Sequence, residues 1–172
     1  MNQPARAPFA PLRSLDDAMA ELLAHAQPLL PAEPVSTFDA DGRVLAQDVV
    51  SALQVPAVDN SSMDGYAVRC ADVATAGVVL PVSQRIAAGM DGAPLLPGTA
   101  ARIFTGAPVP AGADAIVMQE DCVAVDGGAV RINAVPPTGQ WIRRAGEDVR
   151  LGASVLQAGM RLAPGALGLA AS

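Results

Sequence analysis

Lysine is absent from this sequence, so all 11 of its basic residues are arginines. Acidic residues number 17, which gives a formal net charge of −6 at pH 7. Aromatic residues make up only 3% of the chain, so it offers few ring faces on which nucleic-acid bases stack. Nucleic-acid-binding proteins also need a basic surface, which an acidic chain does not supply. We therefore expect no nucleic-acid partner.

Cysteine, histidine and long apolar runs are also scarce. Cys70 and Cys122 stand far apart without CxxC spacing, so a zinc site is not expected. His25 is the only histidine, and we interpret it as a structural residue of a helix. Apolar residues make up 51% of the chain, yet no run reaches the roughly 20 residues that span a bilayer. The start of the chain lacks an apolar signal core, so we expect a cytoplasmic protein without a membrane anchor.

The two ends of the chain carry helical patterns. Residues 1–13 show no periodicity and are expected to form a flexible arm. Ser14 has the character of an N-cap, and apolar residues at helical spacing predict an amphipathic helix that ends near Ala26. From Arg161 on, the sequence predicts the first turns of a helix opened at Pro164, which the chain leaves without a C-cap.

The middle of the chain is typical of short strands separated by turns. Between residues 33 and 53 two structures fit, a hairpin around the turn at 39–42 or a strand followed by a short helix over 43–50. The strand candidates after Tyr66 are 78–82, 84–86, 101–104, 115–118, 122–125 and 129–132. Each is bounded by Gly, Pro, Asp or Asn, and Asp126-Gly127-Gly128 is a strong hairpin signal. Short strands punctuated in this way favour a small barrel or sandwich.

The polar stretch from Val58 to Val68 is the centre of the candidate site. It places the carboxylates of Asp59 and Asp64 on either side of three further polar residues, Asn60, Ser61 and Ser62. Asn, Asp and Ser favour turns because their side chains bond the nearby backbone. Carboxylates on a rigid turn suit a hard cation such as Mg²⁺ or a general acid/base role. The alternative is a surface turn whose aspartates only accept hydrogen bonds from backbone N–H groups.

Two further stretches have the composition of ligand sites. A strand leads into the corner at Thr105 and Gly106, which is expected to expose a hydroxyl and free N–H groups to a ligand. Arg143 and Arg144 are followed across a glycine turn by two acidic residues, the second of which is Asp148. These arginines either hold a phosphate or pair with carboxylates across a cleft. The alternative is a solvated turn with an internal salt bridge.

Four motifs occur in one fixed order along the chain. They are D-N-S-S-M-D-G-Y-A (59–67), T-G-A-P-V-P (105–110), V-M-Q-E (117–120) and I-R-R-A-G-E-D (142–148). This series resembles the N-terminal part of the MoeA/gephyrin E-domain family, the molybdopterin molybdenumtransferases. The resemblance runs from about Ser14 to Ser172, and Ser62 departs from the alanine that is usual in the family.

The resemblance implies a mixed, mainly β fold with an N-terminal amphipathic helix. A small β-barrel-like or sandwich-like domain, residues 50–146, is inserted into an elongated α+β segment made of residues 14–49 and 147–172. Family members continue with a molybdopterin-binding-like α/β domain and a last β domain, and this chain has neither. The chain is therefore expected to show little or no turnover alone.

The resemblance also implies a reaction and a set of residues. Such enzymes take adenylated molybdopterin and molybdate, release AMP in the presence of Mg²⁺, and insert molybdenum. The expected catalytic positions are Asp59, Thr105 and Asp148, of which the two aspartates hold the metal or position a water. The expected substrate-binding residues are Asn60, Ser61, Asp64, Gly106, Arg143 and Arg144. The expected partners are a second copy, as a homodimer, and a molybdopterin adenylyltransferase upstream.

Two other functions compete with the enzyme hypothesis. One is a non-catalytic dimerisation or scaffold module of the gephyrin type, which has no need of all three catalytic positions. The other is a self-contained metal-dependent phosphohydrolase, for which the sequence lacks clustered histidines and a third nearby carboxylate.

Overall fold

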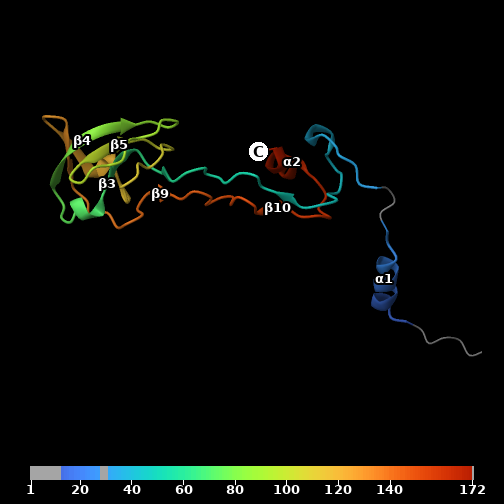
Figure 1. The fold of residues 1–172 in the computed structure, drawn as a ribbon. Helices are drawn as coiled ribbons and strands as arrows, with labels where there is room; N and C mark the ends of the chain where they lie inside the picture. The colour runs from blue at the N-terminus through green and yellow to red at the C-terminus, as the bar shows by residue number, and fades with distance from the viewer. Residues whose placement is uncertain (1–12, 28–30, 172) are drawn as a thin grey trace, which may run out of the picture.

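The computed structural model describes residues 13–27 and 31–171. The predicted flexible arm over residues 1–13 lies outside these ranges, except for its last residue. A curled sheet occupies one end of the molecule, and two long antiparallel segments connect it to a small helical end (Figure 1). We call these two segments, residues 43–61 and 142–161, the stalk.

The main element is a six-stranded sheet in the order β6-β3-β5-β4-β8-β7. Its strands are β3 (Gly65–Val68), β4 (Val78–Ile86), β5 (Ala100–Ile103), β6 (Ala115–Met118), β7 (Cys122–Val125) and β8 (Ala129–Ile132). Neighbouring strands are antiparallel except for β4 and β5, which are parallel. The sheet curls on itself as an open half-barrel (Figure 1), so the prediction of a small barrel-like domain is confirmed. All six strands fall inside the predicted range 50–146, whose boundaries stay a prediction.

Apolar side chains are buried on both faces of this sheet. Successive residues of a strand point to opposite faces, so Ala67 and Val68 belong to two separate apolar clusters. Val68 packs with Val130 and Ile132, whereas Ala67 packs with residues that include Ile103. Each fully buried isoleucine contributes about 1.5–3 kcal/mol of burial free energy. Small and branched aliphatic residues thus build the core of a chain that has few aromatics.

The strand predictions hold best where turn residues mark both ends. β6, β7 and β8 coincide with the predicted segments, and Val125 pairs with Ala129 across the predicted hairpin. Gly127 and Gly128 both have positive φ there, 81° and 75°, which is why glycine suits this turn. The two predicted strands 78–82 and 84–86 are wrong as separate elements. They form the single strand β4, whose register shifts between Val82 and Gln84 as it changes partner from β8 to β5.

The stalk is held by short pairings between residues far apart in the sequence. β1 (Val49–Val50) pairs with β10 (Ser154–Leu156), and β2 (Asn60–Ser61) pairs with β9 (Ile142–Arg143). At the far end, Ala40, Leu156 and Leu162 form a third apolar cluster, against which residues of α2 (Pro164–Ala171) pack. The described residues also form short 3₁₀ helices: η1 (Thr37–Asp39), η2 (Cys70–Asp72) and η3 (Gln119–Asp121).

Both predictions for residues 33–53 are wrong. The segment forms η1, a turn and the two-residue strand β1, without a hairpin around 39–42 and without a helix over 43–50. Val44 instead forms an isolated antiparallel bridge with Arg161, and Leu45 donates its N–H to the Met160 carbonyl at 2.9 Å. The partner of this segment lies more than a hundred residues away, so local sequence did not indicate it.

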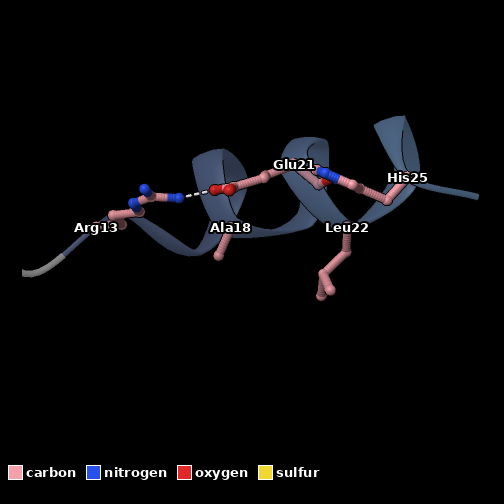
Figure 2. Close-up of a pocket in the computed structure, with 5 residues that line it drawn as sticks. All are labelled: Arg13, Ala18, Glu21, Leu22 and His25. Atoms are coloured by element: carbon pink, nitrogen blue, oxygen red, sulfur yellow. Dashed lines mark hydrogen bonds and ion pairs between the residues drawn. The ribbon is translucent and has the colours of Figure 1, made fainter.

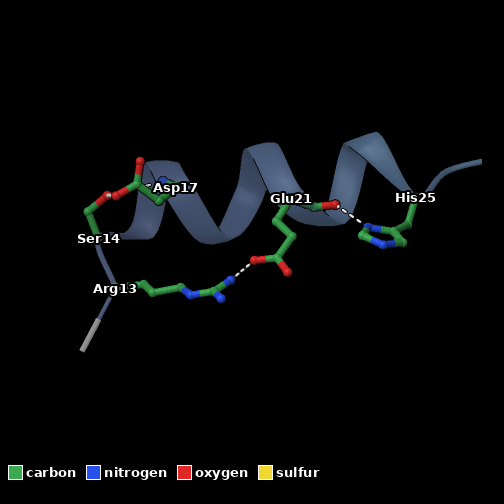
Figure 3. A network of polar contacts seen from close by, with 5 residues as sticks. All are labelled: Arg13, Ser14, Asp17, Glu21 and His25. Carbon is green, nitrogen blue, oxygen red and sulfur yellow. Dashed lines mark hydrogen bonds and ion pairs between the residues drawn. The ribbon is translucent and has the colours of Figure 1, made fainter. Parts of the chain in front are cut away.

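The predicted N-terminal helix is present as α1 (Leu15–Ala24). Ser14 caps it, because the Asp17 N–H donates to the Ser14 hydroxyl at 3.1 Å, and Arg13 forms an ion pair with Glu21 (Figure 3). The His25 ring nitrogen Nδ1 lies 2.7 Å from the Glu21 carbonyl oxygen. None of the helix residues is buried, and none of the helices in residues 13–27 and 31–171 is long and apolar enough to cross a membrane.

Candidate functional site

The four sequence motifs meet where the stalk joins the sheet. The pairing of β2 with β9 places Asn60 opposite Arg143 and Ser61 opposite Ile142. An isolated bridge also joins Asn60 to Pro108 in the second motif. Gln119, from the third motif, donates its backbone N–H to the Asp64 carbonyl at 3.0 Å. Segments that are spread over ninety residues of sequence thus form one region.

Asp59 is held by two groups from the last motif. Its Oδ1 accepts the Ala145 N–H at 2.8 Å, and its Oδ2 accepts a hydrogen bond from Arg144 Nη1 at 2.6 Å. The Ala145 N–H is the main cause that lowers the pKa of Asp59, Arg144 adds to it, and partial burial opposes both. An ordinary aspartate is already ionised at neutral pH, and a lowered pKa keeps Asp59 a carboxylate at more acidic pH as well. Asp59 therefore suits metal binding or water positioning better than a general acid role.

Asp64 is bound in a similar way by the second motif. Its Oδ1 accepts both the N–H and the hydroxyl of Thr105, each at 2.8 Å. The Thr105 N–H is the largest cause that lowers the pKa of Asp64, followed by the Thr105 hydroxyl. These partners lie 41 positions away in the sequence, so the aspartate links two loops rather than capping its own turn.

The Thr105 corner has fewer free hydrogen-bond donors for a ligand than the sequence predicts. The N–H of Thr105 is bonded to Asp64, and the N–H of Gly106 donates to the Ser61 carbonyl at 2.8 Å. The N–H of Ala107 donates to the Phe104 carbonyl at 2.9 Å. The prediction of free backbone N–H groups at this corner is therefore wrong. The exposed hydroxyl oxygen of Thr105 keeps acceptor capacity, because its proton is the part used by Asp64.

The two adjacent arginines have different partners. Arg143 forms an ion pair with Asp148 in its own motif, which raises the pKa of Arg143. Arg144 reaches across to Asp59, 85 positions earlier in the sequence, while its own N–H donates to Glu147 Oε2 at 2.9 Å. Arg143 thus forms an internal salt bridge, and Arg144 pairs with a carboxylate from a distant part of the sequence, whereas phosphate binding by these arginines stays a prediction.

The remaining predicted residues shape the site. Ser61 is buried, and its hydroxyl donates to the Met63 carbonyl at 2.6 Å. Asn60 lies beside it in β2 and is half-buried. Sequence reasoning missed Ala145, which binds Asp59 through its backbone, and Arg102, which bonds Gln119 at 2.7 Å. Every residue except proline has a backbone N–H, so residue type did not indicate that Ala145 would be a donor. Arg102 stands two residues before Phe104, and side chains two positions apart along a strand lie on the same face. This spacing was the sequence signal that could have pointed to Arg102.

A preformed metal cage is not seen in the described parts of the chain. Residues 13–27 and 31–171 contain no group of three or more His, Cys, Asp or Glu side chains placed to hold an ion. A surface hollow lies along α1 (Figure 2). It is lined by Arg13, Ala18, Glu21, Leu22 and His25. All of its lining residues belong to α1 or directly flank it, and none comes from the four motifs, so we do not take it as a site.

Comparison with known proteins gives consistent matches. The family model described as "MoeA N-terminal region (domain I and II)" matches residues 13–172. The molybdopterin molybdenumtransferase 2 of Mycobacterium tuberculosis H37Rv is 47% identical over 163 residues, covering 90% of this chain and 38% of that protein. The molybdopterin molybdenumtransferase of Synechococcus elongatus is 45% identical, covering 86% of this chain and 38% of that protein. A crystal structure of the molybdopterin biosynthesis moeA protein from Pyrococcus horikoshii OT3 has a TM-score of 0.72 at 34% identity, over 80% of this chain and 37% of that one.

The fold and the site define a class of domain: a small, mainly β unit on a two-stranded stalk, with paired carboxylates and arginines at the junction. The chain belongs to the family described as the MoeA N-terminal region, and the resemblance inferred from the four motifs is confirmed. It spans well under half of the length of the relatives it matches.

Proposed function

We propose that this chain is the N-terminal part of an enzyme of molybdenum cofactor biosynthesis. In the proposed reaction the enzyme takes adenylated molybdopterin and molybdate, releases AMP, and inserts molybdenum. Relatives that are 45% and 47% identical carry the name molybdopterin molybdenumtransferase, which supports the assignment. The observation that carries it is the junction of stalk and sheet, where Asp59, Thr105 and Asp148 lie on loops tied to one another by hydrogen bonds.

Each proposed catalytic residue has a role that its contacts allow. Asp59 is ionised, so it accepts hydrogen bonds from a water or binds a cation. Thr105 uses both of its donors on Asp64, so its hydroxyl oxygen would accept a hydrogen bond from substrate. Arg143 and Arg144 each have a carboxylate partner that is exposed or half-exposed. Either arginine can exchange that partner for a phosphate oxygen, to which guanidinium groups bind bidentately.

Mg²⁺ is the metal that we propose, and Asp59 and Asp148 are the residues that would hold it. Their oxygens are the hard donors that Mg²⁺ prefers, and each oxygen has lone pairs beyond the one its present partner uses. Mg²⁺ commonly takes one or two carboxylates from a protein and completes its shell with water and substrate phosphate, so this donor set fits the ion. When bound, the ion would neutralise negative charge on the phosphate oxygens.

The rest of the catalytic site is proposed to come from outside this chain. The relatives are more than twice as long as the matched region, and we propose that the missing part supplies the pterin and molybdate contacts. We also propose that the longer protein is a homodimer and that a molybdopterin adenylyltransferase supplies its substrate. The alternative of a non-catalytic scaffold module makes no use of the ionised Asp59 or of the Thr105 hydroxyl.

Release of AMP from adenylated molybdopterin, with molybdate and Mg²⁺ present, tests the proposal. We expect release by this chain when it is extended by the C-terminal part of a relative, and none by the chain alone. Asp59→Asn in the extended form should lower kcat by about 100-fold or more, because a neutral amide binds a cation poorly. Asp126→Asn, in the exposed β7–β8 turn, is the matched control and should leave kcat unchanged. AMP release by the short chain, or full activity of Asp59→Asn, would contradict the proposal.

A further inference from the structure

Arg102 in β5 donates one hydrogen bond to the backbone just after Asp64 and one to the side chain of Gln119. Its Nη1 donates to the Gly65 carbonyl at 3.1 Å, and its Nη2 donates to Gln119 Oε1 at 2.7 Å. The backbone N–H of Gln119 in turn donates to the Asp64 carbonyl at 3.0 Å. Arg102 therefore fixes two consecutive carbonyls. It binds that of Gly65 directly and that of Asp64 through Gln119.

The same guanidinium lies against two aromatic rings. Its central carbon is 5.2 Å from the centroid of Tyr66 and 4.6 Å from the centroid of Phe104. Both distances are within the range of cation–π attraction. Tyr66 follows the Asp64 turn, and Phe104 immediately precedes Thr105. Arg102 thus contacts the chain next to both members of the Asp64–Thr105 pair.

The register of the sheet explains why Arg102 occupies this place. Tyr66 lies opposite Arg102 across β3 and β5, and side chains alternate along a strand, so residues 102 and 104 share a face. The sheet therefore delivers a rigid, planar donor to the point where the Asp64 loop and the Thr105 loop leave it.

We propose that Arg102 is a positioning residue that holds Asp64 and Thr105 in one fixed arrangement. It acts through the neighbours of these residues in the chain, and the arrangement is the pair of 2.8 Å hydrogen bonds that Thr105 donates to Asp64. The catalytic meaning of this role rests on the function proposed above, in which Thr105 contacts substrate.

Arg85 in β4 is a matched control within the same sheet. It lies opposite Arg102 in the β4–β5 register, and its guanidinium carbon is also 4.6 Å from the Phe104 centroid. Among the described residues, the guanidinium that donates to the Gly65 carbonyl and to Gln119 Oε1 is that of Arg102 and not that of Arg85. Arg85 and Arg102 therefore share charge and ring contact and differ in the links to the Asp64 turn.

Replacement by lysine separates positioning from charge. Lysine keeps the positive charge at residue 102 but cannot donate to two acceptors in a fixed fork. In Arg102→Lys we expect the Thr105 amide proton to exchange with solvent about tenfold faster, because its bond to Asp64 loosens. The pKa of the Asp64 carboxyl, followed by carbon-13 NMR, should rise toward its ordinary value. Arg85→Lys should change neither measurement, and equal changes in the two variants would overturn the proposal.

Gln119→Ala tests the same link at an exposed side chain, so it remains informative if Arg102→Lys fails to fold. It removes one acceptor of Arg102, and we expect a smaller increase in Thr105 amide exchange. An unchanged exchange rate in Gln119→Ala, together with an unfolded Arg102→Lys, would count against positioning through this residue.

Kinetics of the C-terminally extended form supply the catalytic readout. We expect Arg102→Lys to lower kcat for AMP release by about tenfold with KM within about twofold, because misplacement of a catalytic group acts mainly on the chemical step. Arg85→Lys should leave both constants unchanged. If the extended form releases no AMP even without substitution, the proposed function fails, and the NMR measurements still decide the positioning role.

Discussion

The sheet and the far end of the stalk are built from similar residues but differ in how they are stabilised. In the sheet, valine and isoleucine side chains such as Val68 and Ile103 are fully buried on both faces. Along the stalk, apolar residues such as Val50 and Leu53 expose 55% and 61% of their surface. At the far end, the buried apolar residues within the described ranges are Ala40, Leu156 and Leu162. The sheet therefore has a core of its own, whereas the stalk depends on backbone pairing and a small cluster.

This difference places the candidate site at the junction of a rigid part and a weakly packed part. Asp64 directly precedes β3 and Thr105 lies just after the end of β5, two inner strands of the sheet, and Asp59 and Asp148 lie in the stalk near the sheet. Positions on rigid elements hold catalytic geometry more tightly than positions on loops. We infer that the Asp64–Thr105 pair is the fixed side of the site and that the arginine–aspartate pairs are its adjustable side.

The largest expected effect tests how tightly the sheet is packed. A Cβ on Gly65 would lie 2.0 Å from the Val117 carbonyl oxygen, which belongs to the backbone of β6. Gly65→Ala should therefore separate β3 from β6 and cost about 4 kcal/mol or more of unfolding free energy. Gly165→Ala in α2 is the control, because nothing lies within 4 Å of its added Cβ. In a helix this change should be neutral or stabilising by up to about 1 kcal/mol. Urea unfolding measures both, and equal stabilities would show that β3 can move.

A second experiment compares one core residue from each region. Ile103 is fully buried in the sheet, and its truncation to alanine should cost about 2–5 kcal/mol. Leu156 is 5% exposed in a cluster of three buried residues, where neighbours can relax, so Leu156→Ala should cost about 2 kcal/mol, at the low end of that range. Trp141 fluorescence follows the sheet end, and NMR signals of α2 follow the far end. We expect Leu156→Ala to shift only the α2 signals; a coupled loss of both would show that the regions unfold as one unit.

The same difference explains what the sequence revealed. Strand segments such as 115–118 and 129–132 carry apolar residues bounded by turn residues, so local pattern was sufficient to find β6 and β8. The stalk pairs Val44 with Arg161 and Val49 with Leu156, and such contacts leave no short-range signature. Local propensity at 43–50 therefore favoured elements that are not formed.

The candidate site shows the same limit at the level of single residues. The acids and arginines were found by residue type, and the four linked motifs identified the family. Their pairing was not predictable, because Arg144 pairs with Asp59 and not with Asp148, which is nearer in sequence. The same turn places the Ala145 N–H against Asp59. A main-chain donor has the same sequence signature at every residue except proline.

The smallest expected effect concerns the adjustable side of the site and its dependence on pH. The pKa of Asp59 is lowered in the folded protein, so its contribution to stability is present above the ordinary carboxyl pKa of about 3.9 and is lost as the pH falls through the lower, folded value. Because Asp59 and Arg144 are both substantially exposed, we expect this contribution to be below about 1 kcal/mol. Asp59→Asn should lower stability slightly at pH 7 and not at all at the acid end, so that the two unfolding curves converge as the pH falls below about 4. Asp126→Asn should run parallel to the unmodified protein throughout. A constant difference between Asp59→Asn and the unmodified protein at every pH would show that the charge of Asp59 does not stabilise the junction, and that only its hydrogen-bonding shape matters there.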